Sequence, residues 1–399
     1  MLRLNGIECH SKPARTGVMV WGMKNTNPIP PSATVPPTRT ANPVRPVSAL
    51  SEDELVVLFK SLGEPAFRVT QLREFVFRKG VAGYEGVTNL SKPLRAKLEQ
   101  AAPLYEMEFS QASAGDDATK WLWKARDGAL IESVQIRVPG RLTSCLSSQV
   151  GCAMGCVFCA TGLSGFERHL QAHEILEQYL QMWGRSGQHA THVVFMGMGE
   201  PLHNFDAVIQ AIHMLNAPPP KGCAIGARRI TISTVGIPQG IRRLAGERLQ
   251  LELAVSLHAP DDETRAKLIP VARRHPIREV MDAVREFSRL ARRIVTYEYV
   301  LLSGVNDSEE QARELVGLLK DHPCKVNLIP FNAVDGAAFS RPALEVQERF
   351  KAILDKAHLP TTIRFSKGRA VDAACGQLRR RATVPQSSPE HVAAQNTMP

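Results

Sequence analysis

Three cysteines in one short loop carry the clearest chemical signal in this sequence. Cys152, Cys156 and Cys159 follow the spacing C-x3-C-x2-C. Structural zinc sites use four ligands, often with paired C-x2-C elements, and the chain has no second such pair. Three thiolates leave one iron of a cubane cluster open to a small-molecule ligand that can receive an electron. The spacing predicts a [4Fe–4S] cluster; a zinc site completed by His169 or His173, or reduced structural cysteines, are the alternatives.

The remaining cysteines do not form a disulfide framework. The chain has 399 residues and eight cysteines, and four of the eight fall between residues 145 and 159. No sustained apolar core of a secretory signal peptide is present near the first residue. This distribution favours a reducing compartment, and we expect the protein in the cytoplasm.

Beyond this loop, the sequence alternates between strand-like apolar runs and segments with helical periodicity, and these elements must position the loop. Six apolar strand-like runs are expected, namely 191–196, 229–235, 251–257, 295–302, 325–330 and 361–365. Amphipathic helical segments lie between them, among them 173–182, 205–215, 277–290 and 343–357. Strands that alternate with helices predict a parallel sheet with right-handed crossovers. Six units suit an open partial barrel better than a closed eight-fold one, so the fold class is α/β with a partial (βα)6 barrel.

Polar residues gather where these strands end, which is where such folds place their active sites. Gly199 and Glu200 follow the strand expected at 191–196, and glycine permits close approach of the backbone to a ligand. Other candidates at strand ends are Ser233, Ser256, Leu257, His258 and Asn332. Taken alone, His258 would more often be a hydrogen-bonded core histidine.

The first third of the chain has a different organisation. Residues 1–48 hold eight prolines and no helical or strand period, so we expect a disordered tail. Ser51 and Glu54 form a capping box that begins a small helical domain at residues 49–105. Alternating runs around Asp127-Gly128 predict antiparallel strands in a β extension at 106–137.

Composition excludes several classes of protein. Hydrophobic residues are 44% and charged residues 22%, which is ordinary for a globular chain. No window approaches the ~20 uninterrupted apolar residues of a membrane span. The net charge is +10, and residues 1–48 contribute six basic residues against one acidic residue, or +5. The mildly basic remainder is compatible with nucleic acid, and arginines cluster at 228–229, 242–243, 273–274, 292–293 and 379–381.

The loop and its neighbourhood resemble the RlmN/Cfr family of radical S-adenosylmethionine (SAM) RNA adenine methyltransferases. The matching motifs are Cys145-Leu-Ser-Ser-Gln-Val-Gly-Cys152, Gly197-Met-Gly-Glu200-Pro201, Ile232-Ser-Thr-Val-Gly236, Ser256-Leu-His-Ala259, Asn327-Leu-Ile-Pro-Phe-Asn332 and Ala373-Ala-Cys375-Gly-Gln-Leu378. The resemblance covers about residues 50–380. It implies a radical SAM core at 138–370, a cysteine-bearing loop at 371–381 and a disordered tail at 382–399.

The resemblance also implies a mechanism. Unmodified C2 of adenine is not nucleophilic, so a carrier and radical chemistry are needed. Cys375 would be methylated by one SAM, and cleavage of a second SAM would start the radical addition of its methylene group to adenine. Cys145 would then resolve the protein–RNA crosslink as a disulfide, and Glu132 would accept the proton from the adenine carbon.

Each of these three residues has a plainer interpretation. Cys375 alone would be a buried small hydrophobe, Cys145 a fourth cluster ligand, and Glu132 a solvent-facing strand residue. The resemblance implies SAM contacts for the polar residues at the strand ends, including an ammonium contact for Glu200. The sites therefore depend on the motif match rather than on residue type.

The implied cofactors are a [4Fe–4S] cluster and SAM. The implied substrates are 23S rRNA and tRNA, with the helical domain helping to seat the RNA. We expect a flavodoxin- or ferredoxin-type electron donor, no membrane partner and a monomer. Methylation at C8, as in Cfr, and an inactive iron–sulfur RNA-binding protein are the alternatives.

Overall fold

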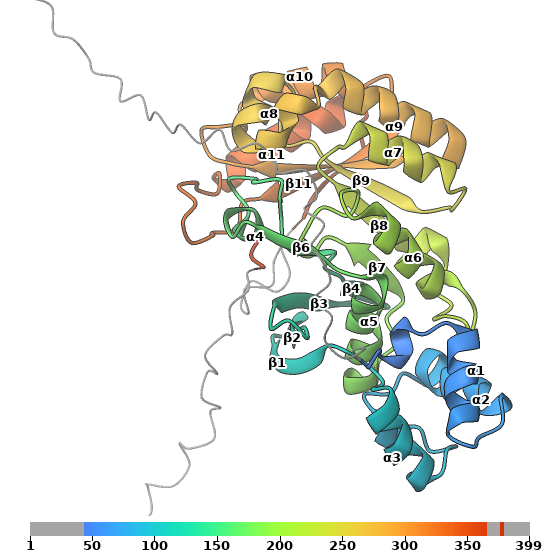
Figure 1. Ribbon diagram of the computed structural model, residues 1–399. Coiled ribbons are helices and arrows are strands. Elements are labelled where there is room, and N and C mark those ends of the chain that lie inside the picture. Colours follow the sequence, from blue (N-terminus) through green and yellow to red (C-terminus); the bar gives the residue numbers. More distant parts are fainter. Residues whose placement is uncertain (1–43, 365–375, 379–399) are drawn as a thin grey trace, which may run out of the picture. The chain divides into compact units, whose positions relative to one another are not determined.

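The structure is a computed structural model that describes residues 44–364 and 376–378 (Figure 1). Four predictions fall wholly or mostly outside these residues: the proline-rich tail up to residue 43, the C-terminal tail, the arginines 379–381 and the methyl carrier Cys375. The disordered tail was expected to reach residue 48, but Val47 is buried and begins the 3₁₀ turn Val47–Ala49, so that end of the prediction is wrong. Among the described residues, no helix has the length and apolar character that crossing a membrane requires.

Most of the described strands form a single mixed sheet. Their order is β1-β2-β3-β4-β7-β8-β9-β10-β11-β12. The strands of this sheet are β1 (Glu108–Ala114), β2 (Ala118–Lys124), β3 (Leu130–Val138), β4 (Arg141–Cys145), β7 (His192–Phe195), β8 (Ile230–Thr234), β9 (Glu252–Ser256), β10 (Val295–Leu301), β11 (Cys324–Pro330) and β12 (Thr361–Ile363). The pairs from β1 to β4 are antiparallel, and every pair from β4 to β12 is parallel. A separate antiparallel pair joins β5 (Gln149–Gly151) to β6 (Phe166–His169).

Helices connect the parallel strands and also form the N-terminal region. The described α-helices are α1 (Glu52–Ser61), α2 (Phe67–Glu74), α3 (Lys92–Ala101), α4 (Ala160–Leu163), α5 (Ala172–Ser186), α6 (Phe205–Asn216), α7 (Pro238–Gly246), α8 (Asp262–Leu268), α9 (Ile277–Ala291), α10 (Glu309–Leu319) and α11 (Leu344–Lys356). Short 3₁₀ turns are η1 (Val47–Ala49), η3 (Tyr84–Gly86), η4 (Ala227–Arg229) and η5 (Pro270–Arg274), and η2 (Phe75–Lys79) is a π-helical turn.

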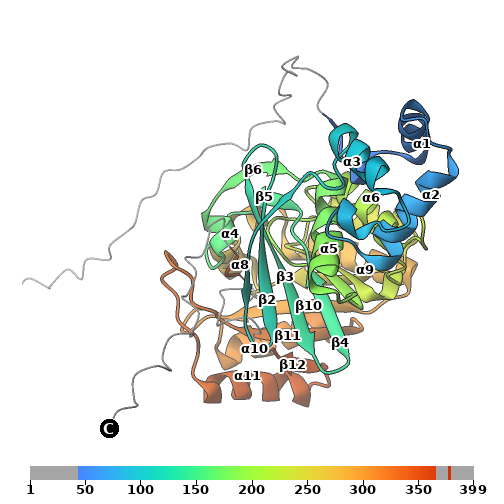
Figure 2. The same cartoon turned by 90° about the horizontal axis from the view of Figure 1, so that it is seen from below.

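The two faces of the parallel sheet have different chemistry. Because side chains alternate along a strand, Ile232, Val255 and Tyr297 point to one face and pack into the main core with α5, α6, α7, α9, α10 and α11. Neighbouring strand residues such as Ser256 and Glu298, which pair in register, point to the other face. This second face is the one that lines the candidate site, and Figures 1 and 2 show the helices along the opposite side.

The predicted fold class is confirmed. All six predicted strands are present within two residues of their expected ends, as β7 to β12. The capping box is also confirmed, since the Ser51 hydroxyl accepts from the Glu54 N–H at 3.2 Å and the Ser51 N–H donates to the Glu54 carboxylate at 2.8 Å. Asp127 and Gly128 lie in the turn between β2 and β3, as predicted. The exact limits of the domains stay predictions.

Several elements were not predicted. The most consequential is β4, which begins the run of parallel strands and ends at Cys145. Its sequence Arg-Leu-Thr-Ser-Cys has too few apolar residues to show a strand period, and neighbouring β3 and β7 supply its pairing. Helices α7 and α10 were likewise not predicted.

Candidate active site

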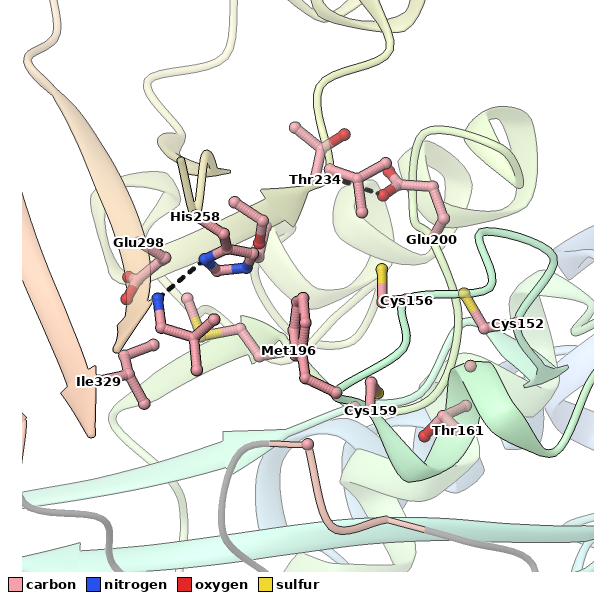
Figure 3. Close-up of a pocket in the computed structure, with 18 of the residues that line it drawn as sticks. Cys152, Cys156, Cys159, Thr161, Met196, Glu200, Thr234, His258, Glu298 and Ile329 are labelled. Atoms are coloured by element: carbon pink, nitrogen blue, oxygen red, sulfur yellow. Dashed lines mark hydrogen bonds between the residues drawn. The ribbon is translucent and has the colours of Figure 1, made fainter. Parts of the chain in front are cut away.

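A cavity opens at the carboxyl ends of the parallel strands. Clefts at this edge of a parallel sheet are the usual place for a small-molecule site. All three cysteines of the predicted cluster loop line it, with Gly199, Glu200, Ser233, Ser256, His258 and Asn332. Figure 3 shows the cysteines on one side of the cavity and His258, Glu298 and Ile329 on the other. The fold therefore brings together residues that are up to 180 positions apart (332 − 152).

The cysteine loop fits a polynuclear iron–sulfur cluster. Burial raises the pKa of Cys152 to about 12 and also raises the pKa of Cys156 well above its usual value, so metal binding must release protons from these thiols. Gly155 has φ +67°, a conformation that glycine adopts without strain. Within residues 44–364 and 376–378, no three His, Cys, Asp or Glu side chains converge on a single-ion position. Three separated thiolates on one loop suit a cluster in which each binds a different iron.

The zinc alternative is not supported by the geometry. His169 Nδ1 hydrogen-bonds to the Gln149 amide at 3.0 Å, and His173 Nε2 contacts the Glu106 carboxylate at 2.8 Å. Neither histidine lines the cavity that holds the three cysteines.

Glu200 is a buried carboxylate at the cavity wall. Its oxygens accept from the backbone N–H groups of Leu202 at 3.0 Å and Val235 at 2.8 Å. Burial raises the pKa of Glu200 to about 7, although these hydrogen bonds act in the opposite direction. A carboxylate with two such donors still has acceptor sites for an ammonium group.

Gly199 and Gln149 fix the position of Glu200. Gly199 has φ +103°, and a Cβ there would lie 2.6 Å from the Gln149 Cβ. The side-chain oxygen Oε1 of Gln149 accepts from the Glu200 N–H at 2.8 Å. The predicted need for glycine at this point therefore has a specific cause, which is contact with Gln149.

His258 presents a neutral imidazole to the cavity. Its Nδ1 accepts from the Val300 N–H at 3.0 Å, so its proton lies on Nε2. Burial lowers the pKa of His258 to about 3, and nearby Arg265 adds to that effect. The ring also makes an edge contact with Phe158 of the cysteine loop, with centroids 4.9 Å apart. His258 is thus both buried and positioned to donate to a ligand acceptor.

The remaining predicted SAM residues divide into two groups. Ser233 and Ser256 end neighbouring strands and line the cavity directly. Asn332 also lines it, and its side-chain oxygen accepts from Arg341 at 3.0 Å. Leu257 is fully buried and does not line the cavity; its backbone N–H donates to the Glu298 carbonyl at 3.0 Å.

Cys145 and Glu132 are buried on the same sheet face, outside the lining of the cavity. Cys145 packs with Val194 and Leu378 in a small apolar cluster. Glu132 is 1% exposed and forms an ion pair with Lys120 at 3.1 Å. The interpretation of Glu132 as a solvent-facing strand residue is therefore wrong.

The residues that follow Cys375 connect the cavity to Cys145. Gly376 lines the cavity, and its carbonyl accepts from the Ala160 N–H at 2.8 Å. Leu378 belongs to the same apolar cluster as Cys145, and its carbonyl accepts from the Thr161 hydroxyl at 2.7 Å.

Sequence reasoning missed several residues of the site. Gln149 belongs to the motif Cys145–Cys152, but only the fold shows that it contacts Gly199 and also accepts from the Glu200 N–H. Lys120, Arg265 and Glu298 are buried charges, and no local pattern separates a buried charge from an exposed one.

The clustered arginines are not equivalent. Arg242 pairs with Glu286 at 3.2 Å, and Arg243 pairs with Asp206 at 2.6 Å. Arg273 and Arg274 are exposed on η5, and no ion pair is found for either among the residues described. Acidic side chains therefore offset the charge of the arginines on α7, whereas none is found to do so for those on η5 in the described chain.

Comparison with known proteins identifies the family of this chain. Residues 146–316 match the radical SAM superfamily, and residues 47–104 match the ribosomal RNA large subunit methyltransferase N-terminal domain. A probable dual-specificity RNA methyltransferase, RlmN 2 of Protochlamydia amoebophila, is 43% identical over 82% of this chain and 92% of its own length. The corresponding RlmN protein of Symbiobacterium thermophilum is 45% identical over 85% of this chain and 92% of its own. A crystal structure of a radical SAM methyltransferase from Sphaerobacter thermophilus has a TM-score of 0.80 and 41% identity, and the match covers 84% of this chain and all of that one.

A partial parallel barrel with a three-cysteine loop at its carboxyl ends defines a radical SAM enzyme, a class that uses a [4Fe–4S] cluster and SAM. The chain belongs to the RlmN family of radical SAM RNA methyltransferases.

Proposed function

We propose that this chain methylates C2 of adenine in 23S rRNA and in tRNA, with Cys375 as methyl carrier, Cys145 as resolving thiol and Glu132 as proton acceptor. The observation that carries the proposal is the position of the segment after Cys375. Gly376 lines the cavity, and Leu378 belongs to the same small apolar cluster as Cys145. Two cysteines 230 residues apart (375 − 145) thus belong to segments that meet.

The cysteine loop and the cavity wall have separate roles in this proposal. Cys152, Cys156 and Cys159 hold the cluster, which together with SAM supplies radical chemistry when both are bound. Glu200 accepts the ammonium group of SAM, and the His258 Nε2–H donates to an acceptor on the same molecule. Gly199, Ser233, Ser256 and Asn332 complete the SAM site. Leu257 does not line the cavity, and it supports the site through its backbone N–H, which donates to the Glu298 carbonyl.

The remaining groups act on the RNA side. Glu132 forms an ion pair with Lys120, and a carboxylate in this position is a group that can accept a proton. The helical domain at residues 49–105 helps to seat the RNA. A flavodoxin- or ferredoxin-type protein donates electrons, and the chain acts in the cytoplasm as a monomer.

A trapped crosslink tests the roles of the two cysteines. Without Cys145, addition to adenine should still occur, but no thiol can release the RNA. Cys145→Ala should therefore purify with covalently attached RNA, seen as ribonuclease-sensitive gel mobility, whereas Cys375→Ala and the double variant should not. Cys223→Ala, which removes a buried core thiol, is the matched control. If Cys145→Ala carries no RNA and only loses activity, Cys145 is not the resolving thiol.

Mass spectrometry of ribosomal and transfer RNA from a deletion strain tests substrate and position together. Loss of 2-methyladenosine from both RNAs is the expected result. Loss of 8-methyladenosine instead would favour the C8 reaction.

A further inference from the structure

Arg265 is a buried cation whose charge has no partner in the described chain. It lies on α8 and is 0% exposed. Its guanidinium donates to three backbone carbonyls: Leu257 at 3.2 Å, His275 at 3.2 Å, and Val235. All three acceptors are neutral. They satisfy the hydrogen bonds of the side chain but do not balance its charge.

No acidic side chain forms an ion pair with Arg265 among residues 44–364 and 376–378. Asp262 is close enough to influence it, but one oxygen of that carboxylate accepts from the Ile277 N–H at 2.8 Å. Burial lowers the pKa of Arg265 to about 10, so the group stays charged at neutral pH. A buried, unbalanced charge costs several kcal/mol, which points to an anionic occupant nearby.

The cysteine loop, which would hold the anionic cluster, lies against the end of the helix that carries Arg265. The Val157 N–H donates to the Leu268 carbonyl at the end of α8 at 3.1 Å, and a Cβ on Gly155 would lie 3.8 Å from Pro270 of η5. Cys156 packs into one apolar cluster with Leu268. Arg265 and Cys156 also lie close enough to influence each other electrostatically.

We propose that Arg265 balances the negative charge of the iron–sulfur centre through Cys156 and so raises its reduction potential. Arg265 is a positioning residue in this proposal, because it contacts neither SAM nor RNA. The inference rests on the cluster assignment of the three cysteines. One electron from the donor protein adds one negative charge at the centre, and a fixed cation stabilises that reduced form more than the oxidised form.

A purely structural role is the competing explanation. The same guanidinium ties Val235, which follows β8, to Leu257, which follows β9. These strands carry Ser233 and Ser256. Loss of the side chain could therefore disturb SAM binding without any effect of charge, so a SAM-independent readout is needed.

The midpoint potential of the reconstituted cluster, measured by EPR-monitored titration without SAM, distinguishes the charge effect of Arg265 from a purely structural role. Arg265→Met and Arg265→Gln should lower the reduced fraction at a given potential by about tenfold, which is about 59 mV for one electron. Arg265→Lys should keep the wild-type potential, because it keeps the charge. Arg265→Gln retains amide donors for the carbonyls, so the test does not depend on the methionine variant folding. Arg242→Met, which removes a partly exposed arginine of α7, is the control.

An unchanged potential in cluster-loaded Arg265→Gln would overturn the inference. So would an equal shift in Arg265→Lys and Arg265→Gln, because the cause would then be the lost hydrogen bonds. A wild-type protein that holds no cluster would overturn the cluster assignment and this inference with it.

Discussion

Glu132 and Cys145 lie on the same face of the sheet, on the adjacent antiparallel strands β3 and β4. Cys145 pairs directly with Val134, and Glu132 precedes Val134 by two residues. Such diagonal neighbours are roughly 7–8 Å apart. Lys120 pairs with Val134 from the other side, so it shares this face as well. A proposed base, its cation and a proposed thiol thus surround one valine.

Loss of Lys120 should impair the proton-accepting step. Lys120→Met removes the cation beside a carboxylate that is 1% exposed, and a buried carboxylate without a cation favours its neutral form. Methylation should slow at neutral pH and its optimum should move to higher pH. Breaking a buried pair should also cost roughly 3–5 kcal/mol of stability. Rates of RNA methylation between pH 6 and about 9 would measure this.

Lys124→Met is the control for that variant, since Lys124 is exposed on the same strand. A Lys120→Met enzyme with the wild-type pH profile would exclude a link between this ion pair and proton transfer.

Each of the three loop cysteines should be needed for the cluster. Anaerobic reconstitution of the wild type should give about four irons per chain. Cys156→Ala should abolish stable loading, because two irons would then lack a thiolate. Cys223→Ala should load normally, since Cys223 lies in the main core. A four-iron spectrum in Cys156→Ala would refute the ligand assignment.

Much of this site could be predicted because parallel strands impose a simple rule. The ends of β7, β8 and β9 are marked by apolar runs, and their carboxyl ends must share one edge. The sequence alone therefore placed three polar residues in the site, namely Glu200, Ser233 and Ser256. The motif match was needed to assign roles to Cys145 and Cys375, because local patterns could not.

The rest depended on contacts between distant segments. Strand β4 has no strand period of its own and is held by β3 and β7. Arg265 follows Asp262 and Glu263 in sequence, which predicts a solvated helix face, yet it is fully buried. The Arg265 side chain is buried because it donates to the backbone carbonyls of Leu257 and Val235 at the ends of two strands, and its neighbours in sequence do not reveal these contacts.

Gly199→Ala should weaken SAM binding. The residue has φ +103°, which costs about 1–3 kcal/mol for a non-glycine residue. A Cβ would also press on Gln149 at 2.6 Å and displace the Glu200 backbone that Gln149 holds. SAM affinity, measured by calorimetry on the cluster-loaded enzyme, should fall roughly tenfold or more.

Gly187→Ala is the control that distinguishes the effect of backbone strain from the effect of the Gln149 contact in Gly199→Ala. Gly187 also has a positive φ, +66°, but a Cβ added there would meet no other atom within 4 Å. That variant should lose some stability and bind SAM normally. Equal SAM affinity in both variants would mean that contact with Gln149 is unimportant.

Glu177 should make the attachment of the N-terminal region depend on pH. This carboxylate on α5 accepts from the Glu106 and Met107 N–H groups at 2.9 and 2.8 Å, and from the Ser48 hydroxyl. Burial raises the pKa of Glu177 from 4.5 to about 7. As pH rises from 4.5 to 7, the unfolded chain releases this proton while the folded chain keeps it. The free energy of unfolding should therefore fall by about 1.4 kcal/mol per pH unit, or roughly 3 kcal/mol in all.

Glu177→Gln should flatten that part of the pH dependence. Denaturant titrations at several pH values would give the difference from the wild type, with exposed Glu99→Gln as the control. A Glu177→Gln protein that keeps the full slope would assign the pH dependence to other groups.

RNA affinity should depend on the arginines of η5 more than on those of α7. Phosphate contacts release counterions, so each arginine that makes one adds about 1 to the slope of log affinity against log salt. Arg242 and Arg243 already pair with acidic side chains, whereas Arg273 and Arg274 are exposed next to the cysteine loop. Changing Arg273 and Arg274 to Gln should lower the slope by up to about 2, and the same change at Arg242 and Arg243 should lower it less. Filter binding of a tRNA over a range of salt concentrations measures both variants. If the two double variants lose the same slope, acidic partners do not decide which arginines bind RNA; if wild-type affinity is flat with salt, arginine–phosphate contacts do not drive binding at all.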